Sequence, residues 1–349
     1  MKKILTYLVL ALFTLSIILL PTTGLQAEEA KGAETKETEV EESEAAEESD
    51  ETVEEKAEEK TEEIEEESEA TEEPGLKITF LVDNNTVVGK MYRGESGLSM
   101  YLEDGDKKIL YDAGYSDAFL FNAQRMGIDL TEIDAIVLSH GHFDHTNGLI
   151  ALMDYFNVRG VDHKIDLICH DDVFNAKEVK GRNFGNIVKE ESLELYFNII
   201  KTKEVYPITE NLYFLGEIER QFDFEEYVPN GTVYKDGEWV EDMMLDDTAI
   251  AYAGKDGVAV IAGCSHSGIC NITEASKKAT GMDKVTHLIG GLHFLKPSEE
   301  KLNGTMEYFK SLDLETIHPC HCVDMHSRFL INQEIPVEQI AVGTVIEIP

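Results

Sequence analysis

Three histidines and one aspartate lie within six positions of the segment LSHGHFDHTNG, residues 138–148. His140 and His142 are two residues apart and follow an apolar run, so in an extended backbone both imidazoles point to the same side. Asp144 and His145 come next, at the start of a predicted helix. Imidazole nitrogens and carboxylates are ligands of Zn²⁺, Mn²⁺ and Fe. Four such groups in one segment favour two adjacent metal ions over one ion, and over a polar turn that faces water.

The elements that must position this segment are short strands that alternate with helices. In the first half we expect strands at 76–83, 98–103, 107–114, 133–139 and 163–170, with helices at 116–127, capped by Ser116, and at 147–156. In the second half we expect strands at 248–254, 257–263, 285–291 and 314–321, with helices at 268–279 and 297–312. This alternation predicts an α/β protein whose sheets are covered by helices, with ligands gathered where strands end.

The N-terminal 74 residues differ in composition from the rest. Residues 1–27 combine a cationic head with an uncharged apolar run at 4–20, which is typical of a secretory signal peptide. An uncleaved membrane anchor is the alternative, because the run reaches the low end of a bilayer-spanning length. Residues 28–74 carry 23 Glu and one Asp against four Lys, which predicts a disordered, self-repelling linker. We therefore expect an exported protein that is secreted or held at the cell surface.

Residues 75–349 contain every histidine, every cysteine and the lone Trp239. Their length predicts one large domain. The whole chain has a net charge of −39, and this part also has an excess of acidic residues, which argues against nucleic-acid binding. Five irregularly spaced cysteines are too few for a disulfide framework and are either buried or in part metal ligands. The expected partner is a small-molecule substrate, with a membrane tether only if the N-terminal segment is uncleaved.

Several segments together resemble a known family. SHGHFDHTNG resembles the H-x-H-x-D-H signature of the metallo-β-lactamase superfamily. LYDAG, VIAGCSHSGICN, HLIGGLHFL and IHPCHC then follow in the order expected of the branch that is similar to dihydropterin ribofuranosylaminobenzene phosphate synthase. The resemblance covers residues 76–349. It implies an αββα metallo-β-lactamase sandwich, spanning residues 75–349, with a one- or two-metal centre at one edge.

The resemblance also implies the metal ligands. The first two histidines of the signature and a third histidine hold one ion, while Asp144, His145 and the late His321 hold the other. The family's usual GHTPG-like loop for the third histidine is missing, because this chain has VEDMMLDD at residues 240–247. We therefore take His266, just beyond a predicted strand, as the replacement ligand, with a hydrogen-bonded turn histidine as the alternative.

Three cysteines lie near these positions. Cys264 stands where the family more often has an aspartate or cysteine that touches the second metal, so it is either a thiolate ligand or a buried thiol. Cys320 and Cys322 flank His321 and point away from it if the strand is regular, so we expect them to contribute only to packing.

Three further polar residues lie at strand ends. His293 either faces the substrate or is a satisfied core histidine, and His170 has the same two interpretations with weaker support. Asp112 either orients a ligating histidine through a hydrogen bond or simply forms a turn.

The metals would determine the mechanism. Two adjacent cations lower the pKa of a bound water, so that a metal-bound hydroxide attacks a polarised bond, and Asp144 is the catalytic residue that accepts a proton or aligns the water. We expect an exported hydrolase with two divalent ions, foremost Zn²⁺ with Mn²⁺ or Fe open, that cleaves an ester, phosphoester or cyclic amide. The alternatives are a di-iron redox enzyme and an inactive metal- or ligand-binding relative. Substrate contacts are expected from residues 171–200 and 219–246.

Overall fold

The computed structural model describes residues 75–349 apart from residues 226 and 315. The predicted signal peptide and Glu-rich linker lie outside these described residues. Within the described part, no helix combines the length and the hydrophobicity needed to cross a membrane.

The N-terminal half of the described chain supplies six strands of a seven-stranded sheet, and the C-terminal end supplies the seventh, β17 (Val345–Ile348). The order of this sheet is β17, β1 (Leu76–Val82), β2 (Ser99–Asp104), β3 (Lys107–Tyr111), β4 (Ala135–Val137), β5 (Ile165–Cys169) and β8 (Phe197–Lys201). The strands from β17 to β3 pair antiparallel, whereas β3, β4, β5 and β8 are parallel. Parallel neighbours need crossover connections, and α1 (Ala118–Met126) and α3 (Leu149–Arg159) supply two of them.

The C-terminal half builds a six-stranded sheet. Its order is β16 (His318–Pro319), β15 (Val285–Gly290), β14 (Gly257–Ala262), β13 (Ala249–Gly254), β10 (Leu212–Phe214) and β9 (Tyr206–Pro207). The helices of this half are α5 (Ile269–Thr280), α6 (Glu299–Ser311) and α7 (Met325–Asn332). Strands β14, β15 and β16 are parallel, so their carboxyl ends lie at one edge of the sheet.

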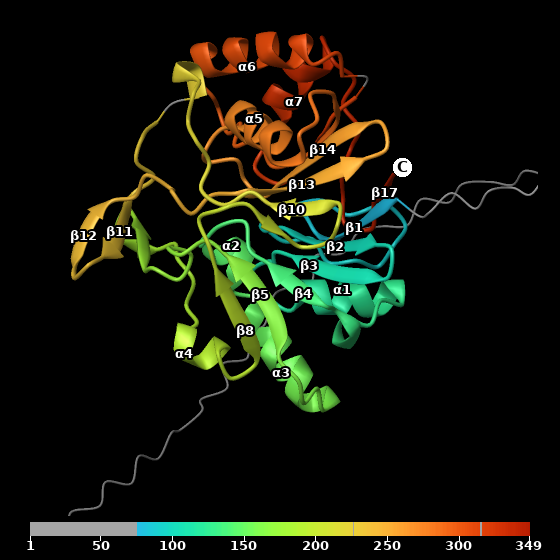
Figure 1. Cartoon of the computed structure of the whole chain (residues 1–349), viewed down its shortest axis with the longest axis vertical. Coiled ribbons are helices and arrows are strands. Elements are labelled where there is room, and N and C mark those ends of the chain that lie inside the picture. The colour runs from blue at the N-terminus through green and yellow to red at the C-terminus, as the bar shows by residue number, and fades with distance from the viewer. Residues whose placement is uncertain (1–74, 226, 315) are drawn as a thin grey trace, which may run out of the picture. The chain divides into compact units, whose positions relative to one another are not determined.

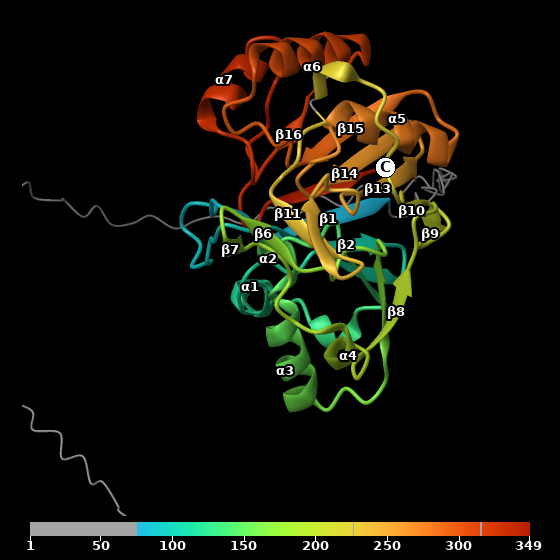
Figure 2. The ribbon, with the colours of Figure 1, turned by 90° about the vertical axis from the view of Figure 1, so that its left-hand side faces the viewer.

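The two sheets face each other across the main apolar core. Phe80 and Tyr111 of the first sheet and Phe214, Ile261 and Ile289 of the second belong to one buried cluster. Two more clusters lie on the outer faces, one beneath α1 and α3 and one beneath α5 and α6. Figures 1 and 2 show the same order of layers. The predicted helix–sheet–sheet–helix sandwich is therefore confirmed.

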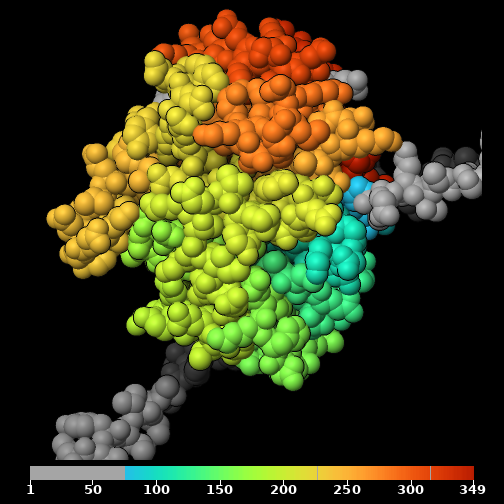
Figure 3. Space-filling model, in the orientation of Figure 1, coloured from blue at the N-terminus to red at the C-terminus, as the bar shows by residue number. Residues whose placement is uncertain are grey.

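A third, four-stranded sheet was not predicted. Its order is β12 (Glu238–Glu241), β11 (Thr232–Lys235), β6 (Lys177–Val179) and β7 (Arg182–Asn183). It arises from the two segments expected to contact substrate, as do the short α4 (Glu190–Leu193) and the 3₁₀ turn Asp223–Glu225. The β11–β12 hairpin stands out at one side of the described part, coloured gold in Figure 3.

Two of the boundaries that differ from the sequence prediction concern a strand end and a helix cap. The strand expected at 314–321 is reduced to His318–Pro319 in the described residues. The φ of 51° at His321 accounts for its carboxyl end, because a left-handed residue cannot continue an extended strand. Helix α1 begins at Ala118 with Asp117 as its N-cap, although the hydroxyl of Ser116 does accept a hydrogen bond from the Ala118 amide at 3.2 Å.

Candidate metal centre

The predicted site residues follow strand ends from both sheets. His140 and His142 follow β4, and the next two signature residues lie in the four-residue helix α2 (Phe143–Thr146). Cys264 and His266 follow β14, while His321 follows β16. Because the two sheets bring these ends to one edge, residues up to 181 positions apart in the chain meet in a single cluster.

The donor atoms form four overlapping groups, and within each group they lie within 4.8 Å of one another. The groups are His140, His142 and His266; His140, His145 and Cys264; Asp144, His145 and His321; and Cys264, His321 and Cys322. His170 is not among them, because its Nε2 lies 3.3 Å from Glu217 Oε2.

The spacing of these donors fits metal ions. In a tetrahedral site with Zn–N bonds of about 2.0–2.1 Å, two ligand nitrogens lie about 3.3 Å apart. His140 Nε2 lies 3.1 Å from His142 Nδ1, and His145 Nε2 lies 3.3 Å from His321 Nε2. The buried Nε2 of His266 has no hydrogen-bond partner, which is costly for a polar atom unless something else binds it. The donor set therefore suits a metal at this edge.

The histidines of the cluster differ in the direction in which their pKa values are shifted. Burial lowers the pKa of His140 and His266 well below the usual value and that of His142 to about 3. These imidazoles are therefore neutral at neutral pH and keep a lone pair for a metal. Burial also opposes a charge on His145, but the Asp112 and Asp144 carboxylates outweigh it and raise the pKa of His145 to about 9. A positive charge, either a proton or a metal cation, is favoured between these two carboxylates.

Asp112 fixes the orientation of His145. Its Oδ2 lies 2.6 Å from Nδ1 of the ring, so the hydrogen bond leaves Nε2 directed into the cluster. Both partners are fully buried, and the carboxylate also accepts hydrogen bonds from the amide and hydroxyl of Ser139. Of the two interpretations offered for Asp112, the structure favours orientation of a histidine.

Asn84 plays the corresponding part for His321 and was missed in the sequence. Its side-chain Oδ1 lies 3.2 Å from Nδ1 of the ring, and its side-chain Nδ2 donates to the His321 carbonyl oxygen at 3.2 Å. The neighbouring Asp83 accepts a hydrogen bond from the His321 amide at 3.4 Å. The only sequence signal was a polar run at the end of the first strand.

A buried ion network supports the turn between His140 and His142. Asp246 accepts a hydrogen bond from the Gly141 amide at 2.8 Å and binds the ammonium of Lys177 at 2.8 Å. Lys177 also binds Asp242 at 2.9 Å. A Cβ at position 141 would lie 2.1 Å from the Val173 carbonyl oxygen, so the turn admits only glycine. The segment 240–247, which replaces the family's usual ligand loop, thus supports the first two histidines instead.

His293 lies beside the cluster. Its ring centroid is 4.2 Å from that of His266, and burial lowers its pKa to about 4. Both segments expected to contact substrate, 171–200 and 219–246, also reach the cluster. The Phe184 ring of the first packs on His142, and Asn230 Nδ2 of the second lies 3.5 Å from His142 Nε2. The role of His293 in substrate binding stays a prediction.

Two of the three nearby cysteines line the cluster. Cys264 Sγ lies 3.3 Å from His145 Nε2. Cys320 packs in the core between the sheets, as predicted. The prediction for Cys322 was wrong: the left-handed turn at His321 breaks the strand, so the thiol of Cys322 lies on the same side as the His321 ring.

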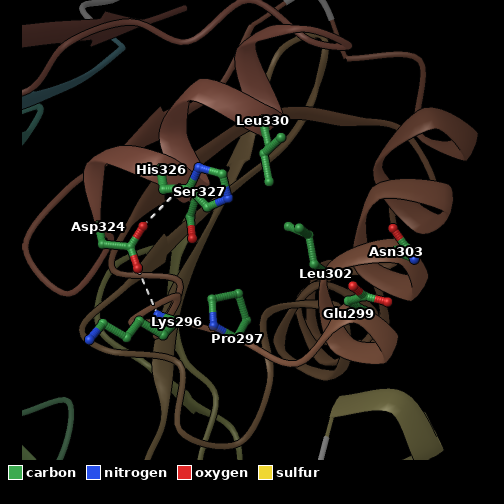
Figure 4. A pocket seen from close by; sticks show the side chains of 9 residues that line it. All are labelled: Lys296, Pro297, Glu299, Leu302, Asn303, Asp324, His326, Ser327 and Leu330. Carbon is green, nitrogen blue, oxygen red and sulfur yellow. Dashed lines mark hydrogen bonds between the residues drawn. The ribbon is translucent and has the colours of Figure 1, made fainter.

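A separate cavity lies between α6 and α7 (Figure 4). It has a volume of about 760 Å³, and its lining includes Lys296, Leu302, Asp324 and Leu330. None of its lining residues belongs to the donor cluster. The metal centre and this cavity are therefore distinct features.

Known proteins with the same pattern identify the family. Residues 92–207 match the family model of the Metallo-beta-lactamase superfamily. An uncharacterized protein of Methanocaldococcus jannaschii is 31% identical over 263 residues, which cover 73% of this chain and 94% of the relative. The 7,8-dihydropterin-6-methyl-4-(beta-D-ribofuranosyl)-aminobenzene-5'-phosphate synthase of the same organism is 28% identical over 289 residues, which cover 78% of this chain and 96% of the relative.

A solved structure agrees with these relatives. The crystal structure of Tm1679, a metal-dependent hydrolase of the beta-lactamase superfamily, superposes with a TM-score of 0.66 and 27% identity, covering 78% of this chain and 98% of that one. The resemblance noted in the sequence, including the branch, is confirmed. This chain belongs to the metallo-beta-lactamase superfamily.

Proposed function

We propose that this protein is an exported, metal-dependent hydrolase that cleaves an ester, phosphoester or cyclic amide bond in a small molecule. The observation that carries the proposal is the convergence of histidines, a carboxylate and a thiol from separate strand ends, with a buried nitrogen of His266 left without a partner. Buried polar atoms normally have hydrogen-bond partners, so the unpartnered nitrogen of His266 beside the other donors supports a bound ion.

The residues divide into two ligand sets. His140, His142 and His266 would hold one divalent ion, and Asp144, His145 and His321 the other, with Zn²⁺ as the foremost candidate. Such ions act as Lewis acids and lower the pKa of a bound water toward neutrality.

Two side chains would act on the reactants, one of them the ligand Asp144. The Asp144 carboxylate is partly exposed, with 18% of its side chain accessible, and lies 3.5 Å from His321 Nε2. It is therefore placed to accept the proton of an attacking water. The neutral His293 ring, next to His266, would hydrogen-bond the substrate or its leaving group.

The relative named as the synthase of an aminobenzene ribofuranosyl phosphate supports a phosphoester among these three substrate classes. The likeness to a structure described as a metal-dependent hydrolase supports hydrolysis. Export is supported by the composition of residues 1–27. N-terminal sequencing of the protein recovered from outside its cells tests export, and a chain that retains residues 1–27 in the cytosol would contradict it.

Metal content and turnover test the reaction. Elemental analysis of the purified chain should find two divalent ions per chain. Among three probe substrates, a phosphodiester, a lactone and a β-lactam, the protein should hydrolyse one. Asp144→Asn should lose turnover, whereas His163→Asn, in an exposed histidine outside the cluster, should retain it. A folded protein that binds no metal would refute the proposal. Bound iron with oxygen reduction and no hydrolysis would favour the di-iron alternative.

A further inference from the structure

The cysteine cluster suggests more than packing. Cys264 follows β14 and Cys322 follows β16, yet their sulfurs and a ring nitrogen of His321 lie within 4.8 Å of one another. All three residues are buried. Two thiols and an imidazole at this spacing form a soft donor set, which is the kind that binds zinc.

The backbone around Cys322 is arranged to admit its thiol. The left-handed turn at His321, with φ 51°, brings the next side chain to the side of the cluster. On the neighbouring strand end, a Cβ at Gly291 would lie 2.4 Å from the Gly263 carbonyl oxygen and 2.6 Å from Cys322 Sγ, so a larger residue would clash with both. The left-handed turn and this glycine together leave room for the thiol.

The hydrogen bonds of Cys322 differ from those of an inert core thiol. Its Sγ accepts the amide proton of His293, with a donor–acceptor distance of 3.2 Å, and this bond would remain in a thiolate. In the metal-free protein the thiol also donates to the Cys264 carbonyl oxygen at 3.4 Å, with the proton that metal binding would release. Hydrogen bonds to sulfur are a recurrent support of metal-bound thiolates. Cys320, two residues earlier, packs instead among apolar core side chains.

We propose that Cys322 and Cys264 both supply thiolate ligands to the ion that His145 and His321 hold. The inference rests on the proposed function, because it requires that ion to bind. Each thiol releases its proton to solvent as its sulfur–metal bond forms. Two thiolates make this position selective for thiophilic Zn²⁺ over Mn²⁺, which prefers oxygen ligands.

Cobalt substitution of the full chain tests the proposal. Co²⁺ bound to thiolates shows a near-ultraviolet charge-transfer band whose intensity scales with the number of Co–S bonds, and its visible d–d bands report binding at any ligand set. We expect Cys264→Ser and Cys322→Ser each to lose about half of the charge-transfer band and the double variant to lose all of it. Cys320→Ser, a matched buried thiol, should keep the full band. A folded Cys322→Ser protein with the full band would overturn the proposal.

A measurement on the unmodified protein guards against variants that fail to fold. X-ray absorption at the zinc edge of the two-zinc protein should find one sulfur per zinc on average, at about 2.3 Å. Half a sulfur per zinc, which is one thiolate per chain, would overturn the proposal that both cysteines bind and would leave the proposed hydrolase intact. Absence of bound metal and of d–d bands would refute both.

Discussion

Replacement of Lys177 by methionine should weaken both the fold and the metal centre. The lysine side chain is 2% exposed, and its ammonium binds Asp242 at 2.9 Å and Asp246 at 2.8 Å. Burial disfavours the charged lysine, but the two carboxylates outweigh it and raise its pKa. Methionine keeps much of the shape and removes the charge, so the two buried carboxylates lose their common counter-ion.

The structure gives the size of the effect. Removal of one partner from a buried ion pair costs about 3–5 kcal/mol, because the remaining charge stays desolvated. That is a large part of the 5–15 kcal/mol that typically stabilises a domain. Burial and the neighbouring Asp246 already raise the pKa of Asp242, whereas Lys177 outweighs burial and keeps the pKa of Asp246 lowered, so without the lysine both carboxyl pKa values should rise. Ionisation of a buried acid with a raised pKa destabilises the folded protein as pH rises. The loss of unfolding free energy in Lys177→Met relative to wild type should therefore be larger at pH 8 than at pH 5.

Urea unfolding of metal-free protein at the two pH values measures the deficit. The same change at Lys310, whose exposed ammonium pairs with Glu334 at 2.8 Å, is the control and should cost less than about 1 kcal/mol. Because Asp246 holds the Gly141 amide between the two histidines, metal affinity of Lys177→Met should also fall by about 10–100-fold. An unfolding free energy within 1 kcal/mol of wild type at pH 8 would refute the reasoning.

Three further changes test other parts of the centre. Asp112→Asn should weaken metal binding by about 10–100-fold, because the amide is a poorer partner for the His145 ring, and an unchanged chelator competition curve would contradict this role. His266→Ala should reduce the metal content from two ions to one, and retention of both ions in elemental analysis would exclude it as a ligand. Burial raises the pKa of Asp247 to about 6, so its contribution to the stability of the metal-free protein should fall by up to about 3 kcal/mol as pH rises from 4 to 6. Asp247→Asn should remove that dependence in urea unfolding, and an identical pH profile would show that its carboxyl is not perturbed.

Local patterns explain what could be predicted from the sequence. The H-x-H-x-D-H spacing places His140 and His142 on one side of a strand end, and the apolar runs mark the strands that bring His321 and His266 to the same edge. The strands and helices that were predicted overlap the observed ones for the same reason, since periodicity and turn residues are local signals. Strands β8, β9, β10 and β17 and helix α7 were not predicted.

The residues that orient the predicted ligands had no such local signal in the sequence. Lys177 and Asp246 are 69 positions apart, and nothing near either one indicates that they form a buried pair beneath Gly141. Asn84 and His321 are 237 positions apart, and their hydrogen bond depends on how β1 lies beside the C-terminal segment. A single sequence shows which side chains can bind, but the contacts that orient them depend on the tertiary fold.

Residues with left-handed φ occur where the sequence prediction of strand geometry failed and where the candidate metal centre lies. Nine non-glycine residues of the described part have left-handed φ, and four of them, Asp112, Ser265, His293 and His321, lie at the centre just beyond strand ends. Such conformations cost of order 1 kcal/mol each and persist where the surrounding structure enforces them. Asp112 directly follows β3, whereas the other three lie two or three residues beyond the ends of their strands. The turn at His321, which bounds the carboxyl end of the strand expected at 314–321, also places Cys322 beside Cys264. Departures from regular strand geometry are therefore where ligands absent from the family signature should be sought.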